Sequence, residues 1–288
     1  MRRIIVTGST GLLGRAVYTD FSRTDQVEGW GWNRSDGGIR RVDLRSRESV
    51  ETRVVDFSPD IVIHCAANRF PDRCEKDPNA AEEVNVAATS HLARVVEKIG
   101  AKMIYVSTDY VFDGTSPPYK ESDTPNPLNS YGISKLKGEE EVELTLSDYI
   151  ILRVSILYGP VEFLEESSIC VLYKYILDNE RRKMDDYSVR YPTYTSDVAG
   201  VMRFLLESGA SGYFHFSGNE AMTKFEMVRQ VAHLKGLSSE HIVPEKNPPE
   251  NGTIRPISSH LDCSKLNDLG FTERTPFSTG IRDTLKTW

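Results

Sequence analysis

The sequence is poor in cysteine and has no paired cysteine motif. Its four cysteines, among 288 residues, stand at 65, 74, 170 and 263, with no CxxC pair and no histidine at metal-ligand spacing from them. This pattern is atypical of a zinc-binding or disulfide-stapled domain, and we expect no metal site. A reducing, cytoplasmic compartment is the simplest interpretation of unpaired cysteines.

Long apolar runs and an excess of positive charge are also missing. The chain carries 35 Lys and Arg against 42 Asp and Glu, a formal net charge of -7. A negative chain is a poor partner for nucleic acid or an anionic membrane surface. No apolar stretch is long enough to span a bilayer, and the N-terminus leads straight into the β-branched run Ile4-Ile5-Val6. We therefore predict no nucleic-acid partner, no membrane partner and no signal peptide.

Short apolar runs alternate with amphipathic segments through the first half of the chain. The run at 60–65 is continuously apolar, which is typical of a strand that is buried on both faces. Alternation of strands and helices indicates an α/β fold, here a Rossmann-type doubly wound parallel sheet. The expected strands are 4–7, 27–32, one ending at 42–44, 60–65, 102–107 and 148–154; the expected helices are 12–21, one carrying Val50, Val54 and Phe57, 82–99 and 131–144.

Three glycines follow the first expected strand. Gly8, Gly11 and Gly14 form a GxxGxxG pattern at the turn into the first helix. The first permits a tight turn, the second lets the backbone approach a pyrophosphate, and the third lets the helix pack closely on the sheet. The helix N-terminus then faces the anion. A turn that merely needs small residues is the alternative, but the position directly after the first strand favours a dinucleotide site.

The end of the second expected strand favours NADP(H) over NAD(H). NAD sites usually place an acid here to hold the ribose 2′-hydroxyl, whereas this chain has Asn33, Arg34 and Ser35. A guanidinium suits a 2′-phosphate, although an exposed surface arginine is the alternative. After Gly159 the elements shorten. We predict an NADP-binding Rossmann domain over 1–158, rejoined by part of 193–216, and a smaller substrate or partner lobe over 159–288.

A second set of residues suggests carbonyl chemistry. Thr108 ends an expected strand, and Tyr131 and Lys135 lie four apart on one face of the following helix. An ammonium beside a phenol lowers the pKa of the phenol, so Tyr131 is a candidate general acid. Thr108 could donate a hydrogen bond to the reacting oxygen. We expect the loop 114–127 and the segment 161–168 to border one cleft with these three residues.

At this point the chain resembles a known family. The stretch 105–114, followed by Tyr119, Glu121, Asp123, Pro127, Asn129 and 131–139, resembles the dTDP-4-dehydrorhamnose reductase family of extended short-chain dehydrogenase/reductases. A narrower resemblance is to the regulatory β subunits of methionine adenosyltransferase. It is carried by 156–159, 164–167, 190–193, 217–220, 222–224 and 274–277.

The resemblance implies roles for individual residues. It implies a catalytic triad of Thr108, Tyr131 and Lys135, and a substrate side that includes Asp109, Ile156 and Arg190. The implied NADP(H)-binding residues are Gly8, Thr10, Gly11, Leu12, Leu13, Gly14, Asn33, Arg34, Ser35, Asp43, Leu44, Ala66, Ala67, Asn85, Tyr131 and Lys135.

The resemblance leaves three functions open. One is an NADP(H)-binding regulatory β subunit that pairs with a methionine adenosyltransferase catalytic subunit in S-adenosylmethionine synthesis. Another is an NADPH-dependent reductase of dTDP-4-dehydrorhamnose or a related 4-keto nucleotide sugar. A third is a reductase of some other small substrate. Ile156 stands where the sugar reductases usually have a tryptophan, which favours the regulatory function.

Overall fold

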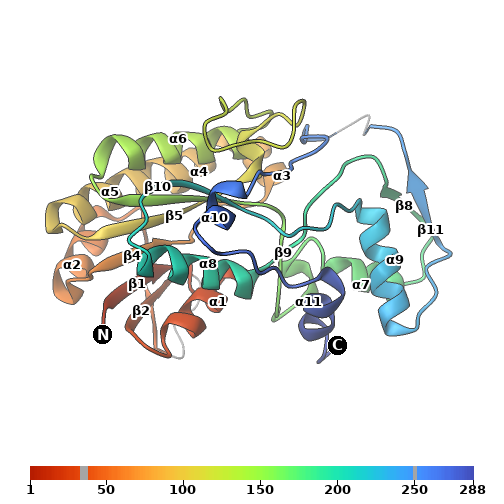
Figure 1. Ribbon diagram of the computed structural model, residues 1–288, viewed down its shortest axis with the longest axis horizontal. Coiled ribbons are helices and arrows are strands. Elements are labelled where there is room, and N and C mark those ends of the chain that lie inside the picture. The colour runs from red at the N-terminus through yellow and green to blue at the C-terminus, as the bar shows by residue number, and fades with distance from the viewer. Residues whose placement is uncertain (33–37, 249–251) are drawn as a thin grey trace.

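A seven-stranded parallel sheet forms the centre of the molecule (Figure 1). The computed structural model describes residues 1–32, 38–248 and 252–288. Strand order reverses direction beside β1, so the sheet is doubly wound, and the predicted fold class is confirmed. In spatial order the strands are β10 (Gly212–Phe216), β6 (Tyr149–Val154), β5 (Lys102–Thr108), β4 (Ile61–His64), β1 (Arg3–Thr7), β2 (Gln26–Gly31) and β3 (Ile39–Arg41).

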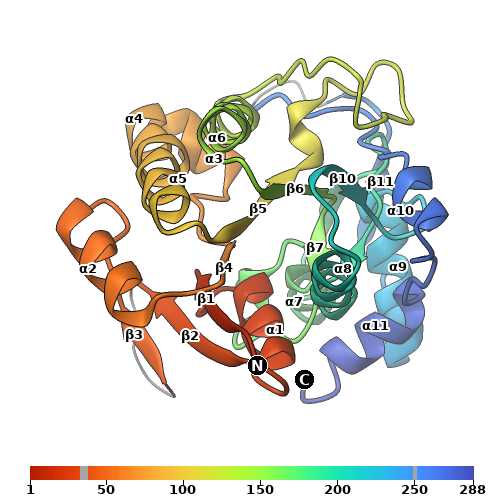
Figure 2. The same ribbon diagram turned by 60° about the vertical axis from the view of Figure 1, so that its left-hand side comes forward.

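Helices cover both faces of this sheet, as Figure 2 shows. One face packs on α1 (Leu12–Phe21) and α8 (Thr195–Glu207), around Val6, Phe21 and Met202. The other face packs on α2 (Arg47–Phe57), α5 (Ala88–Ile99) and α6 (Ser130–Thr145). Two of these elements, α8 and β10, come from the second half of the chain, so the sheet is completed only after the chain has left it and returned.

The remaining C-terminal elements form a smaller lobe with its own buried cluster. Its members include Tyr158, Ile169, Met227 and Phe277, so this lobe does not depend on the sheet for its apolar contacts. The elements are β7 (Leu157–Tyr158), η3 (Leu164–Glu166), α7 (Val171–Leu177), β8 (Arg182–Asp185), β9 (Thr193–Tyr194), α9 (Lys224–Lys235), β11 (Ile242–Glu245) and α11 (Phe277–Thr284); the short helix α10 (Ser264–Asp268) packs against β10 instead.

Two boundaries differ from the sequence prediction. The third strand ends at Arg41, and 42–44 follow it rather than end it. The helix predicted over 82–99 is three pieces: α4 (Pro78–Glu82), the π-helical turn η1 (Glu83–Ala87) and α5. A π turn inserts one extra residue per turn, and this one carries Asn85 at its centre. The short helices α3 (Pro71–Lys76) and η2 (Asp109–Val111) complete the fold.

Two negative findings apply to the described ranges. None of their helices is long and apolar enough to cross a membrane. Within the same ranges, no three His, Cys, Asp or Glu side chains come together in a way that could hold a metal ion.

Candidate functional site

A cavity of about 810 Å³ opens at the carboxyl ends of the sheet strands. Its walls come from the turns after β1, β2, β4, β5 and β6 and from the smaller lobe. Ligands of doubly wound folds bind at this edge, where strand order reverses. Most of the predicted site residues line it: Gly8, Thr10, Gly11, Leu12, Leu13, Gly14, Asp43, Leu44, Ala66, Ala67, Thr108, Asp109, Tyr131, Lys135, Ile156 and Arg190.

The glycine turn has the geometry of an anion cradle. Gly8 has φ +68, and a Cβ on it would lie 2.8 Å from the Ala66 nitrogen. A Cβ on Gly14 would lie 2.0 Å from the Gly8 carbonyl oxygen, so both glycines are sterically required. Gly11 caps α1 without a side-chain hydrogen bond, and the first turn holds no acidic residue. The amide groups of this helix end are therefore available to a pyrophosphate.

One end of the cavity is built from the turns after β2 and β3. Of the predicted cofactor residues, Asn33, Arg34 and Ser35 lie outside the described residues. Asp43 accepts two hydrogen bonds from the Arg45 guanidinium, both at 2.9 Å, which hold the pKa of its carboxyl below the usual value. The Arg45 guanidinium lies 5.1 Å from the centroid of the Trp32 ring, and both residues line the cavity. Sequence reasoning missed this pair, although it flanks Arg34 and Asp43 in the sequence.

Asn85 supports the wall of the cavity from behind. Its amide group exchanges two hydrogen bonds with the Asn68 backbone, at 2.7 and 3.0 Å, and donates a third to the Ser134 hydroxyl at 2.9 Å. The π turn places this amide between the loop after β4 and the helix that carries Tyr131. Asn85 thus links Ala66 and Ala67, which line the cavity, to α6.

Thr108, Tyr131 and Lys135 meet at the end of β5. The Thr108 hydroxyl donates to the Asp109 carboxylate at 3.1 Å, and the proximity of Thr108 favours the ionised form of Tyr131. Burial outweighs it and raises the pKa of Tyr131 above its ordinary value. The net shift is thus opposite to the predicted lowering, and Lys135 is not among the groups that shift this pKa most. The Lys135 ammonium lies 3.9 Å from the centroid of the Tyr105 ring, and burial lowers the pKa of Lys135 to about 7.

A buried ion pair lies one helical turn beyond Lys135. The Glu139 carboxylate, fully buried, accepts hydrogen bonds from the Arg153 guanidinium at 2.9 and 2.7 Å and from the Ser107 hydroxyl. Its charge acts to raise the pKa of Lys135, against the larger effect of burial. The Arg153 guanidinium also lies 3.3 Å from Nε2 of His215, a residue of the edge strand β10.

The predicted substrate residues lie at the other end of the cavity from Trp32. Ile156 gives this end an aliphatic wall. Asp109 accepts a hydrogen bond from the Ser155 hydroxyl at 2.9 Å, and burial raises the pKa of its carboxyl. Arg190 is 3% exposed and donates to the Val189 carbonyl at 2.8 Å.

The predicted rim of this cleft is only partly correct. No residue of 114–127 is among the described residues that line the cavity, and only Ser168 of the second segment is. The loop packs instead on the C-terminal segment, where the Tyr119 amide donates to the His260 carbonyl at 2.9 Å. Nothing in the local sequence of the loop indicates that distant partner.

The segment 161–168 joins the two lobes through Glu166, whose contacts with Arg15 and Arg69 we call the latch. The Glu166 carboxylate accepts both NH groups of Arg15, each at 2.6 Å, and the Glu166 carbonyl accepts from Arg69 at 2.7 Å. Arg15 also donates to the Thr10 carbonyl at 2.8 Å, in the glycine turn. Sequence reasoning missed Arg15, Arg69 and Glu166 because their partners are far apart in the chain.

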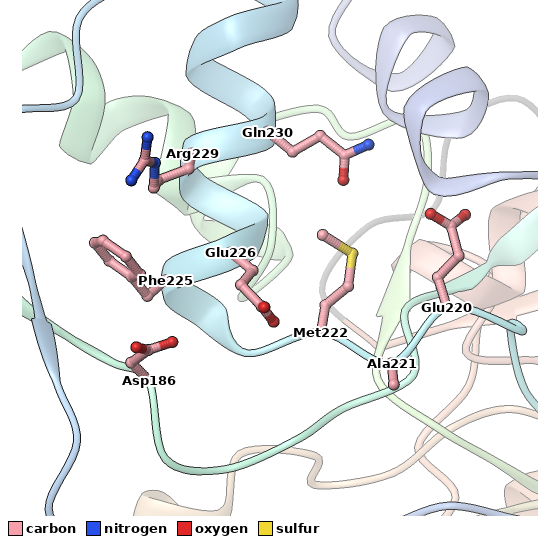
Figure 3. Close-up of a pocket in the computed structure, with 8 residues that line it drawn as sticks. All are labelled: Asp186, Glu220, Ala221, Met222, Phe225, Glu226, Arg229 and Gln230. Carbon is pink, nitrogen blue, oxygen red and sulfur yellow. The ribbon is translucent and has the colours of Figure 1, made fainter.

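A second depression, of about 690 Å³, lies beside α9 (Figure 3). Three of its residues are acidic, but each already has a local role. Asp186 accepts from the Thr223 hydroxyl, Glu226 from the Thr223 amide, and Glu220 from the Phe277 amide. These carboxylates cap and join helices, so the cavity beside the glycine turn is the better candidate site.

Comparisons with known proteins agree with this geometry. The model of the family described as RmlD substrate binding domain matches residues 1–288. The chain belongs to this family. A relative of this chain, "Methionine adenosyltransferase 2 subunit beta" of Mus musculus, is 45% identical over 99% of this chain and 87% of its own length.

Two solved structures bear on the cofactor. The dTDP-4-dehydrorhamnose reductase of Bacillus anthracis, in complex with NADP, is 25% identical with a TM-score of 0.90, over 100% of this chain and 99% of that one. The UDP-glucose 4-epimerase of Thermus thermophilus, in complex with NAD, is 25% identical with a TM-score of 0.85, over 99% and 98%. Proteins similar to this RmlD-family chain therefore bind dinucleotides of both kinds.

Proposed function

We propose that this chain binds NADP(H) in the cavity and acts as the regulatory β subunit of a methionine adenosyltransferase. The observation that carries the proposal is the 45% identity, over 99% of the chain, to a protein named as that subunit. The chemistry of the cavity is compatible with it. The glycine turn and the free end of α1 would hold the pyrophosphate, Asp43 and Leu44 would lie by the adenine, and Ala66 and Ala67 would line the nicotinamide side.

The proposal for NADP(H) rather than NAD(H) rests on Arg34. Its guanidinium would pair with the 2′-phosphate, and no acid stands at 31–35 to hold a 2′-hydroxyl. We expect NADP+ to bind at least about tenfold more tightly than NAD+, because one charge-assisted contact easily supplies about 1.4 kcal/mol. Calorimetry on the wild type, Arg34→Ala and the exposed control Arg23→Ala measures this. Equal affinities in the wild type, or an unchanged preference in Arg34→Ala, would contradict it.

The partner is tested by co-elution. We expect the purified chain and the methionine adenosyltransferase catalytic subunit of the same source to elute from size exclusion as a stoichiometric complex. Separate elution of the two at micromolar concentration would overturn the regulatory proposal.

A second candidate function is favoured by the intact hydroxyl pair. Thr108, Tyr131 and Lys135 all line the cavity, as a reductase of a 4-keto nucleotide sugar would need. A bound NADPH would supply the hydride, and Tyr131 would give the proton to the carbonyl oxygen. We expect little or no turnover of dTDP-4-dehydrorhamnose. Ile156 offers a smaller packing surface than an indole, which alone would slow turnover about tenfold to a hundredfold, and the stretch 190–192 also follows the regulatory pattern. Robust turnover that is lost in Tyr131→Phe would favour the reductase.

A further inference from the structure

The end of the cavity beyond Tyr131 gathers cationic side chains from three separate segments. Arg190, Lys224 and Arg255 all line it. They are 34 and 31 residues apart in sequence, by subtraction of their numbers, and each belongs to a different loop or helix start. Such convergence of like charges is unfavourable unless something compensates it.

Backbone hydrogen bonds hold the three segments together. Arg190 and Met222 exchange N–H to carbonyl bonds in both directions at 2.9 Å, and the Val189 amide donates to the Ile257 carbonyl at 2.8 Å. A capping box at Thr223 fixes the start of α9, where Lys224 is the first helical residue. The three cations are therefore positioned by the fold, as a binding site requires.

Neighbouring carboxylates compensate these charges only in part. Asp109 lies near enough for the Arg190 charge to act on it, but burial raises the pKa of its carboxyl. Asp72 accepts from Arg255 at 2.8 Å but is itself largely exposed. Asp185 also lines the cavity, and one of its oxygens accepts from the Tyr187 and Ser188 amides. No hydrogen bond or ion pair joins the Lys224 ammonium to another described residue. Burial, and then the charges of Arg255 and Arg190, lower the pKa of Lys224.

Tyr110 connects this cationic end to the hydroxyl pair. Its ring centroid lies 6.0 Å from that of Tyr131, and the Arg190 guanidinium carbon lies 5.9 Å from the Tyr110 centroid. Arg190 thus lies about one aromatic side chain away from Tyr131.

We propose that Arg190, Lys224 and Arg255 bind the phosphoryl group of a compact second ligand, a phosphorylated carbonyl or alcohol compound. A phosphoryl group carries close to two negative charges at pH 7 and three acceptor oxygens, which match one ammonium and two guanidinium groups. The carbon end of the ligand then faces Tyr131 and Thr108. The inference rests on the proposed function, since a dinucleotide at the glycine turn would occupy the remainder of the cavity.

Calorimetric titration with inorganic phosphate tests this site. The protein is first saturated with NADP+, so that phosphate cannot occupy the dinucleotide's own anion sites. We expect phosphate to bind the wild type, and its Kd to rise at least tenfold in Lys224→Met. Lys98→Met removes the same charge from the exposed end of α5 and should leave the phosphate Kd within twofold. The NADP+ Kd of Lys224→Met should stay within twofold of the wild type, which reports an intact fold.

Three results would overturn the proposal: no phosphate binding to the wild type, an equal phosphate Kd in Lys224→Met, or tighter binding of malonate than of phosphate. Failure of the wild type to bind NADP+ would contradict the proposed function instead. The same variants titrated with phosphate in the unloaded protein would then still decide the anion site.

Discussion

Burial controls the charge of the central lysine at the scale of single residues. Lys135 is 2% exposed, its ammonium faces Tyr105, and its surroundings also include Glu139, Cys65 and His64. Of these groups Glu139, and after it Cys65, favour the charged lysine, yet burial still lowers the pKa of Lys135 to about 7. The charge of this residue is therefore a property of the pocket and not of its position in a Tyr-x3-Lys pair.

A pH dependence of stability follows from this shift. Between pH 7 and 10.5 the unfolded chain keeps the Lys135 proton while the folded chain has lost it. The free energy of unfolding then rises with pH, by up to about 1.4 kcal/mol per pH unit from this group. Urea unfolding at pH 7, 8 and 9 should show this rise in the wild type, and a smaller one in Lys135→Met. Parallel pH profiles for the two proteins would contradict the prediction.

Close packing of the glycine turn on α1 dominates at the scale of elements. The missing Cβ of Gly14 lets the helix start against the Gly8 carbonyl, and this contact aims the helix amides at the cavity. Any side chain there must separate the turn from the helix.

Gly14→Ala should therefore weaken NADP+ binding at least tenfold and lower the free energy of unfolding by about 1–3 kcal/mol, the usual cost of overpacking. Gly200→Ala is the control, because its Cβ would meet nothing closer than 3.8 Å inside α8. That variant should bind NADP+ normally and gain roughly 0.5–1 kcal/mol. Calorimetry and urea unfolding measure both effects, and equal behaviour of the two variants would count against the steric argument.

A buried ion pair, Glu139 with Arg153, also joins the inner face of α6 to β6. Glu139→Ala leaves a guanidinium that is 3% exposed without its carboxylate, which should cost about 3–5 kcal/mol. Glu140→Ala, on the exposed side of the same helix, should change stability by less than about 0.5 kcal/mol. Chemical denaturation of both variants decides this, and a loss under 1 kcal/mol in Glu139→Ala would show that the pair is not critical.

Contacts between the lobes matter most at the scale of the whole molecule. Arg15 at the start of α1 holds Glu166 of the smaller lobe, and Glu166 is 3% exposed. Because Arg15 also donates to the Thr10 carbonyl, this latch joins the glycine turn to Glu166 of the smaller lobe.

Weakening the latch should speed the release of the dinucleotide. We expect Glu166→Gln to raise the NADP+ dissociation rate several-fold, since a buried charged pair loses one partner. Glu165, the residue before Glu166, forms an exposed ion pair with Lys174. Glu165→Gln removes that pair and should leave the dissociation rate unchanged. Stopped-flow displacement measures both rates. Equal NADP+ dissociation rates in the two variants would show that the latch does not slow release of the dinucleotide.

The sequence by itself determined the alternation of strands and helices, the glycine turn and the meeting of Thr108 with Tyr131. These features depend on local periodicity and on residues at strand ends, which parallel strands bring to one edge of the sheet.

Only the tertiary structure decided which distant segments meet. Arg190, Lys224 and Arg255 converge, Glu166 reaches Arg15, and the loop 114–127 leaves the cavity to pack on the C-terminal segment. The π turn at Asn85 and the lowered pKa of Lys135 also depend on packing around them. Periodicity carries no information about contacts between residues far apart in the chain, and the free energy of a charge depends on everything packed against it.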